Sequence, residues 1–216
     1  MPLSAIWEVL RSCLLVVSAL FPIVNPLGNT PIFLSLTPGY SSRARFILSR
    51  QIAIYSFWLL VGSMLIGTHI LAFFAVTVPC VQVGGGLVVM STAWSLLKSE
   101  PQQTRSTASA KVSQQDLNAR AFYPLTLPLT VGPGSISVAI TLGANQAPSG
   151  AIIRFATALI GPVLIALTIF LCYVFAERIA RVLGETAMNV IVRLNSFILL
   201  CIGVEITWNG VRALLH

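Results

Sequence analysis

The chain has 216 residues, of which 56% are hydrophobic and 9% are charged. Soluble domains carry about 25% charged residues, so this composition excludes a soluble enzyme, a nucleic-acid-binding module and a disordered tail. The formal net charge of +7 would suggest nucleic acid in a soluble protein. Here most basic residues lie in short loops between apolar stretches, where membrane proteins place them. We therefore expect a lipid bilayer around the chain and no nucleic-acid partner.

Six apolar stretches follow one another, and each is long enough to cross the hydrocarbon core as a helix of about 20 residues. They cover residues 6–36, 51–74, 79–97, 121–143, 151–176 and 190–215. One polar stretch, rich in Ser, Thr, Gln and charge, separates the third from the fourth. The sequence therefore predicts an all-α integral membrane protein with six transmembrane helices: three spans in residues 1–97, a polar cytoplasmic linker at 98–119 and three spans in residues 120–216.

Basic residues follow the odd-numbered spans. The loops after the first, third and fifth spans hold them, whereas the loops after the second and fourth hold none before Arg154. Because Lys and Arg concentrate in cytoplasmic loops, we expect the odd-numbered loops in the cytoplasm and both termini outside. If the proline-rich first and fourth stretches were re-entrant hairpins, the first and fifth loops would lie on opposite sides, so we expect both stretches to span. The residues concerned are Arg43, Arg45, Arg50, Lys98, Arg105, Lys111, Arg120, Arg178 and Arg181.

The first and fourth stretches carry the same proline pattern. Residues 21–31 read Phe-Pro-Ile-Val-Asn-Pro-Leu-Gly-Asn-Thr-Pro, and residues 123–133 read Tyr-Pro-Leu-Thr-Leu-Pro-Leu-Thr-Val-Gly-Pro. Both fit aromatic-Pro-x3-Pro-Leu-x3-Pro at an offset of 102 residues. With three spans in each half, the second half enters the membrane from the opposite side. The sequence thus predicts two inverted three-helix repeats with proline-broken first and fourth helices, a common plan of secondary transporters.

The prolines predict breaks that are costly in hydrocarbon. Each proline in a helix removes one N–H donor and favours an extended residue before it, such as Asn25, Thr30 and Gly132. Bare backbone groups are tolerated only inside protein or beside a watery cavity. Pro31 and Pro133 suit the first positions of new helices capped by Thr30 and Gly132. We expect the two breaks to meet at mid-membrane, where helix N-termini and freed carbonyls would suit a zwitterionic amino acid.

The candidate substrate-binding site is uncharged and surrounds the two breaks. It comprises Asn25, Pro26, Gly28, Asn29, Thr30, Thr130, Gly132, Pro133, Gly134 and Ser135, with Thr126 as a further polar side chain. The alternative is that the prolines only kink two helices for packing. Glu205, an acidic residue well inside an apolar run, is a candidate for proton coupling, but its spacing to Asn209 and Arg212 favours an interfacial pair. No catalytic pair, metal-ligand cluster or nucleotide motif occurs, so we expect no enzyme activity, cofactor or metal.

Three motifs together resemble the MarC family of bacterial inner-membrane proteins, which is grouped with the neutral amino acid transporters. They are Asn-Pro-Leu-Gly-Asn-Thr-Pro at 25–31, Gly-Gly-Gly-Leu at 84–87 and Gly-Pro-Gly at 132–134. The resemblance covers nearly the whole chain and implies a six-helix inner-membrane protein that moves neutral amino acids such as glycine or alanine, with export as one direction. The glycines at 84–86, with Gly62 and Gly67, are expected to allow close helix contact.

Two classes of function remain open. The first is a secondary transporter that moves a small neutral solute by alternating access around a mid-membrane site. The second is a non-transporting membrane protein that organises partner proteins, which predicts a tightly co-purifying partner and no solvated central cavity. The sequence leaves open the substrate, the direction, the coupling proton or cation and the oligomeric state.

Overall fold

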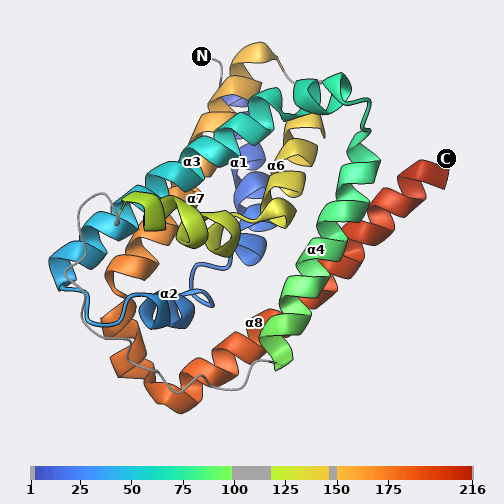
Figure 1. Cartoon of the computed structure of the whole chain (residues 1–216). Coiled ribbons are helices and arrows are strands. Elements are labelled where there is room, and N and C mark those ends of the chain that lie inside the picture. Colours follow the sequence, from blue (N-terminus) through green and yellow to red (C-terminus); the bar gives the residue numbers. More distant parts are fainter. Residues whose placement is uncertain (1–2, 99–117, 146–149, 216) are drawn as a thin grey trace.

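The computed structural model describes residues 3–98, 118–145 and 150–215, and these residues form helices joined by short turns (Figure 1). Most of the predicted linker at 98–119 lies outside the described residues. The elements are α1 (Leu3–Val24), α2 (Thr30–Leu36), α3 (Ser42–Phe73), α4 (Val78–Lys98), the π-helical segment η1 (Ala121–Thr130), α6 (Pro133–Asn145), α7 (Ala151–Val174) and α8 (Ala176–Leu215).

Five helices in the described part of the chain are long and apolar enough to cross a membrane: α1, α3, α4, α7 and residues 189–215 of α8. The segment 118–130 and α6 form a pair bent by 70°, which makes a sixth crossing if the pair spans as one unit. The prediction of an all-helical integral membrane protein is therefore confirmed, with five or six candidate spans.

Two helices extend well beyond the predicted spans. α3 has 32 residues, which gives about 48 Å at 1.5 Å per residue, against about 30 Å of hydrocarbon. It begins at Ser42 because the Ser41 side chain caps it by accepting a bond from the Ala44 N–H at 3.2 Å. α8 begins at Ala176 and bends at Gly184, where φ is 71°. Residues expected in the first and fifth loops are thus helical, because hydropathy marks membrane depth and not helix ends.

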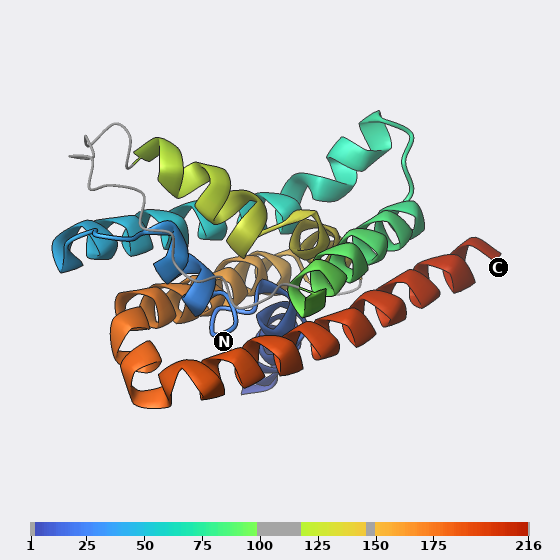
Figure 2. The ribbon, with the colours of Figure 1, turned by 60° about the horizontal axis from the view of Figure 1, so that its bottom comes forward.

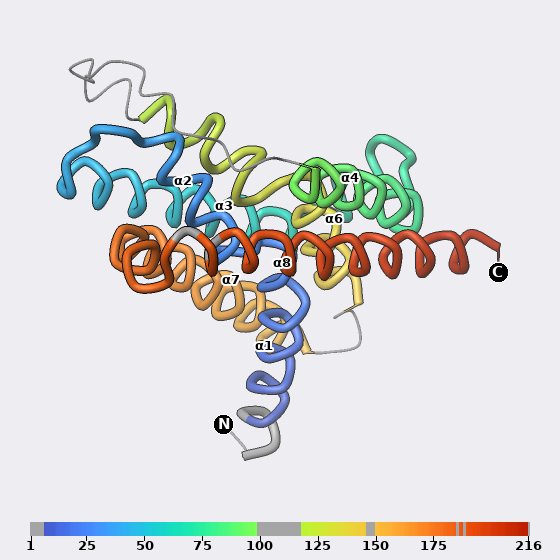
Figure 3. Tube along the Cα trace, turned by 90° about the horizontal axis from the view of Figure 1, so that it is seen from below, coloured from blue at the N-terminus to red at the C-terminus, as the bar shows by residue number. Residues whose placement is uncertain are grey.

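α3 packs against α6, α7 and η1. α1 packs on α7, α4 packs on α8 and α6, and α2 contacts α7 and α8. α4 and α8 lie side by side (Figure 2), and α1 runs crosswise to α8 when the molecule is viewed from below (Figure 3). Fully buried side chains from α1, α3 and α7 fill the centre: Leu20, Leu48, Ile52, Leu60, Ile165 and Ile169.

Glycines bring the backbones of α4 and α8 into contact. A Cβ added at Gly86 would lie 2.8 Å from the Gly203 carbonyl oxygen, and one at Gly203 would lie 2.9 Å from the Met90 nitrogen. A Cβ at Gly210 would lie 2.8 Å from the Pro79 carbonyl oxygen. Real Cβ atoms essentially never come closer than 3.0 Å to such atoms. Small residues are therefore required along this seam, as is common where membrane helices pack closely.

The predicted glycine contacts are confirmed at some positions and wrong at others. Gly67 faces Ile140 of α6, and Gly85 and Gly86 face α6 and α8. Gly62 and Gly84 would admit a Cβ with nothing within 4 Å. A run of three glycines on one helix cannot all face one partner, because successive residues point in different directions.

Replacing Gly86 by Ala should lower the melting temperature of the protein in detergent, because the added methyl meets backbone atoms, and overpacking costs about 1–3 kcal/mol. The matched variant Gly84→Ala adds the same methyl in open space. It should leave the melting temperature unchanged or raise it, since Ala in the middle of a helix is more stabilising than Gly by about 0.5–1 kcal/mol. Thermal unfolding followed by tryptophan fluorescence checks the pair, and equal melting temperatures would contradict the close α4–α8 contact.

Candidate functional site

The first break separates α1 from α2 at residues 25–29. The helical hydrogen bonding of α1 continues past Pro22. Its last bond runs from the Asn25 N–H to the Phe21 carbonyl oxygen at 2.9 Å. Asn25 then turns the chain with a φ of 48°. Its Oδ1 accepts a bond from the Gly28 N–H at 3.1 Å, and such local bonds let Asn adopt the left-handed conformation. The expectation of an extended Asn25 is therefore wrong.

α2 begins one residue earlier than predicted. Its N-cap is Asn29, and Pro31 lies in its first turn. Thr30, expected to be an extended cap residue, is instead helical and fully buried, so both expectations for it are wrong. Its Oγ1 donates to the carbonyl oxygen of Pro26 at 3.0 Å, so it is occupied with the backbone of the break. Asn29 makes no side-chain cap bond and has helical dihedrals (φ −83°, ψ −10°) in place of the extended ones usual at an N-cap.

At the second break, residues that precede a proline are extended, as the sequence predicts. Tyr123 (φ −127°, ψ 126°) and Leu127 (φ −106°, ψ 127°) are extended inside η1. Each directly precedes a proline, whose ring disfavours the helical region for the residue before it. α6 then begins at Pro133, as the sequence predicts, after a two-residue gap across which the chain bends by 70°.

Side chains supply donors near the breaks. The Nδ2 of Asn29 donates to the carbonyl oxygen five residues earlier at 2.9 Å. The hydroxyls of Thr126 and Thr130 do the same at 2.6 and 2.7 Å. Hydrocarbon offers a carbonyl no other partner, so these bonds complete the irregular backbone. In this structure the polar side chains predicted to face a solute are engaged with the protein itself.

The two breaks touch each other. The Asn29 amide donates a second bond, to the carbonyl oxygen of Leu129 at 3.1 Å, across 100 residues of sequence. Asn29 is 6% exposed, and Thr130, next to Leu129, is 1% exposed. The prediction that the two proline-rich segments come together is therefore confirmed. We call this junction of Asn29, Leu129 and Thr130 the break junction.

Tyr173 of α7 covers the break junction, and the sequence analysis missed it. Its hydroxyl lies 2.9 Å from the Thr130 Oγ1. A hydroxyl can donate only one hydrogen bond, and the Thr130 hydroxyl donates to the Leu125 carbonyl oxygen. The Tyr173 hydroxyl is therefore the donor in its bond to Thr130. The Tyr173 ring stacks on Phe33 of α2, with centroids 4.6 Å apart and 6° between planes. The available signal was a tyrosine in an apolar run, because a buried phenol needs a partner.

The remaining predicted residues in α6 face other neighbours. A Cβ at Gly134 would lie 3.5 Å from the Gly85 carbonyl oxygen of α4, so this glycine faces α4. Ser135 is buried, at 2% exposure. Ser137, which was not predicted, joins α6 to α4 by donating to the Val81 carbonyl oxygen at 2.8 Å. The start of α6 is thus fixed against α4, a few residues beyond the break junction.

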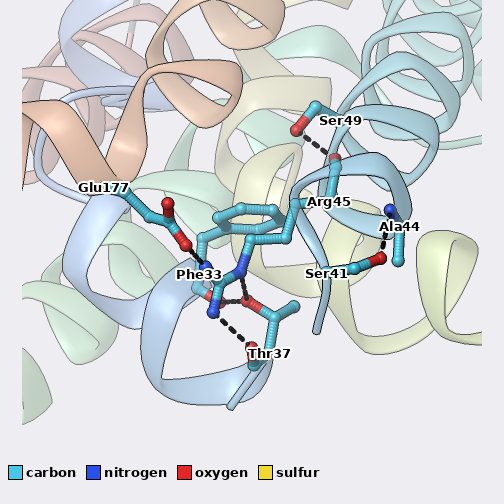
Figure 4. A network of polar contacts seen from close by, with 7 residues as sticks. All are labelled: Phe33, Thr37, Ser41, Ala44, Arg45, Ser49 and Glu177. Carbon is cyan, nitrogen blue, oxygen red and sulfur yellow. Dashed lines mark hydrogen bonds and ion pairs between the residues drawn. The ribbon is translucent and has the colours of Figure 1, made fainter. Parts of the chain in front are cut away.

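Figure 4 shows a polar network at the end of α2. Arg45 of α3 donates from Nη2 to the Thr37 carbonyl oxygen at 2.8 Å and from Nε to the Thr37 hydroxyl at 3.3 Å. That hydroxyl donates to the Phe33 carbonyl oxygen at 2.8 Å. Arg45 also forms an ion pair with Glu177 in the first turn of α8. From the sequence, Arg45 served only to assign topology, because Glu177 lies far away in the chain and no motif marks the bonds to Thr37.

Glu205 lies apart from the break junction, on an exposed face of α8. The Nδ2 of Asn209 donates to its Oε1 at 3.1 Å, so the pairing predicted from their spacing is present. Within the described ranges, no three His, Cys, Asp or Glu side chains gather as metal ligands would.

The fold and the break junction define a class: a polytopic α-helical integral membrane protein in which two interrupted helices meet inside the bundle. The chain belongs to the MarC family, because the model of that family, described as MarC family integral membrane protein, matches residues 10–215. The family resemblance of the motifs is therefore confirmed.

Named relatives match along nearly their whole length. The UPF0056 membrane protein YvbG of Bacillus subtilis is 31% identical over 91% of this chain and 92% of its own. MJ1677 of Methanocaldococcus jannaschii is 27% identical over 95% and 98%. The UPF0056 inner membrane protein MarC of Salmonella typhimurium is 27% identical over 89% and 90%. No solved structure matches. The names of these relatives state membrane location, and for the Salmonella protein the inner membrane.

Replacing Asn29 by Ala should destabilise the protein, because it removes the donor from the buried Val24 carbonyl oxygen and from the part-buried Leu129 carbonyl oxygen. An unsatisfied buried group costs about 1–3 kcal/mol. The control is Asn209→Ala, which removes one bond on an exposed face of α8 and should cost much less. Thermal unfolding in detergent checks both variants, and equal melting temperatures would show that Asn29 does not hold the two breaks together.

Proposed function

We propose that this protein is an inner-membrane secondary transporter that moves a small neutral solute, foremost a neutral amino acid, by alternating access. The observation that carries the proposal is the bond from the Asn29 amide to the Leu129 carbonyl oxygen, which joins the two interrupted segments. Irregular backbone inside a membrane protein commonly builds the substrate site of transporters. A purely mechanical kink would need only one proline in each helix.

The packing supports an inverted repeat. We match α1, α2, α3 and α4 with η1, α6, α7 and α8, in that order. α1 packs on α7, and η1 packs on α3; α2 packs on α8, and α6 packs on α4. The pairs α3 with α7 and α4 with α8 map onto themselves. Exchanging the halves thus reproduces these contacts, as a two-fold axis in the membrane plane would require. Among the described residues, the contacts of α1 with α6 and α8 have no counterpart of similar extent, so the halves are not identical.

The groups at the break junction favour a neutral solute. They are an amide, two hydroxyls and backbone carbonyls, belonging to Asn29, Thr130, Tyr173 and Leu129. A net charge would find no counter-charge among them, and burying an unpaired charge is expensive. A zwitterion brings its own counter-charge: its ammonium group can replace the Asn29 amide as donor to carbonyls. Its carboxylate can accept from hydroxyls or from the N–H groups that begin α6, which lack partners within the helix.

The orientation follows from the same arrangement and the distribution of charge. The ion pair between Arg45 and Glu177 places the first and fifth loops at the same end of the bundle. In Figure 1, the C-terminal end of α4 lies toward the Arg45 end of the bundle, and the α3–α4 turn lies at the opposite end. We propose that the end with Arg45 is cytoplasmic and that both termini are outside, since basic loops face the cytoplasm.

Purified protein in liposomes should exchange at least one labelled neutral amino acid, from a panel including glycine, alanine, serine and leucine, faster than empty liposomes. Thr130→Val should reduce this exchange at least about tenfold, because it removes a hydrogen-bonding group worth about 1–2 kcal/mol or more. Thr130→Ser keeps the hydroxyl and should retain exchange. Elution as a single folded species on size exclusion is required of both variants.

Absence of exchange for every amino acid would sink the amino-acid proposal. Absence of exchange together with a stoichiometric protein that co-purifies would favour the alternative of a membrane protein that organises partners. Equal exchange by the Val and Ser variants would show that the break junction does not handle the solute.

Labelling from one side tests the orientation. In a chain whose native cysteines are replaced by Ser, single cysteines are placed at Ser42, beside the α2–α3 turn, and at Val76, in the α3–α4 turn; both positions are exposed. A membrane-impermeant maleimide should label Val76→Cys in spheroplasts and Ser42→Cys only in everted vesicles. The reverse pattern would invert the proposed orientation, and labelling of both from one side would remove α3 as a span.

A further inference from the structure

α2 is a short rigid piece between two turns with unusual backbone. It has seven residues, and it lies between Asn25, with a φ of 48°, and Gly39, with a φ of 70°. Hinge motions are absorbed by a few residues at the ends of elements. Glycine crosses between the left-handed and right-handed regions without steric cost, and Asn is the next most tolerant residue. The chain therefore provides a pivot on each side of α2.

The inner end of α2 closes over the break junction. Phe33 is fully buried and stacks face to face on Tyr173. The hydroxyl of that same Tyr173 donates to Thr130, and the side chain of Asn29 lies beside it. The stacked rings of Phe33 and Tyr173 therefore lie against the break junction, four residues before Thr37 and Glu177 respectively.

The outer end of α2 is held by the network of Figure 4. Arg45 binds the hydroxyl and the carbonyl oxygen of Thr37, which directly follows α2, and it pairs with Glu177 of α8. Thr37 lies four residues after Phe33, and Glu177 lies four residues after Tyr173. The stacked rings join α2 to α7. Four residues further along each chain segment, Arg45 of α3 links Thr37 to Glu177 of α8. Phe33 and Thr37 are themselves linked by a hydrogen bond of 2.8 Å.

The corresponding helix of the second half is held differently. A Cβ at Gly143 of α6 would lie 2.8 Å from the carbonyl carbon of Met64 in α3, and Gly134 faces α4 at close range. α6 is thus fixed by tight packing against the α3 backbone and against Val89 of α4. α2 is held by side-chain contacts, and those at its outer end are polar contacts that can exchange partners with water. Glu177 is 46% exposed, so its half of the ion pair already meets solvent.

We propose that α2 is the gate of the transport pathway at the Arg45 end of the bundle, and that this structure shows it closed. The proposal rests on the proposed function and adds the moving part. Opening breaks the Arg45 contacts to Thr37 and Glu177, unstacks Phe33 from Tyr173 and swings α2 about Asn25 and Gly39. The break junction then faces water on that side, while α6 stays in place against α3 and α4.

The test measures access to the break junction and needs no transported solute. In the chain without native cysteines, Thr130→Cys is modified by a charged, membrane-impermeant methanethiosulfonate. The reagent is added from the face that carries the α2–α3 turn, as established by labelling of Ser42→Cys. The modification rate is compared with Arg45 intact, with Arg45→Gln and with Glu177→Gln. Arg43→Gln, an exposed arginine two residues away, is the matched control.

Arg45→Gln should accelerate modification about tenfold or more, because it removes both the ion pair and the charge-assisted bonds that favour the closed state. Glu177→Gln removes only the ion pair and should have a smaller effect. Arg43→Gln should have none. The Arg45→Gln rate should remain low when the reagent is added from the opposite face.

An unchanged rate in Arg45→Gln would overturn the gate, and so would equal acceleration from both faces, which would mean general loosening. The outcome is independent of the flux assay. Acceleration from the predicted face without amino acid exchange would retain the gate and reject the proposed solute. Exchange without acceleration would retain the transporter and reject α2 as its gate.

Discussion

The structure depends on one constraint, which is that a carbonyl group inside a membrane must find a donor within the protein. Prolines interrupt the helical hydrogen bonding of the first and fourth membrane segments, and side chains supply donors to carbonyl groups beside the breaks. The Asn29 amide serves both breaks at once, while the hydroxyls of Thr126 and Thr130 serve the second. The bonds that repair the backbone are therefore also the bonds that hold the two halves together.

Local stereochemistry allowed the breaks to be predicted from the sequence. The extended residues before Pro124 and Pro128 follow from a steric clash between neighbouring residues. Pro133 can begin its helix because the first N–H groups of a helix have no acceptor within it, so the missing N–H costs nothing there. At the first break the same rule fails at Asn25, because the side-chain bond to Gly28 selects a left-handed turn instead. Predictions from steric effects between neighbouring residues hold where no side chain competes for a hydrogen bond with the same backbone group.

What could not be predicted depends on partners that are distant in the chain. Tyr173 gives no sign in the sequence that it reaches Thr130 and Phe33. Gly203 and Gly210 become meaningful only when α4 lies against them. The sequence suggested which residues surround the breaks, but not that they would be bonded to one another. In the proposed transporter a solute would have to compete for these existing hydrogen bonds, so it would need to form as many hydrogen bonds as it displaces.

The glycine seam between α4 and α8 limits how the two halves can move. Where backbones touch, a helix cannot slide lengthwise without driving the next Cβ into a carbonyl group. It can still roll slightly about the line of contact. If the halves move as proposed, α4 and α8 would therefore form the axis of that motion: the halves would tilt around this pair without separating, and the largest displacements would fall on the segments farthest from it.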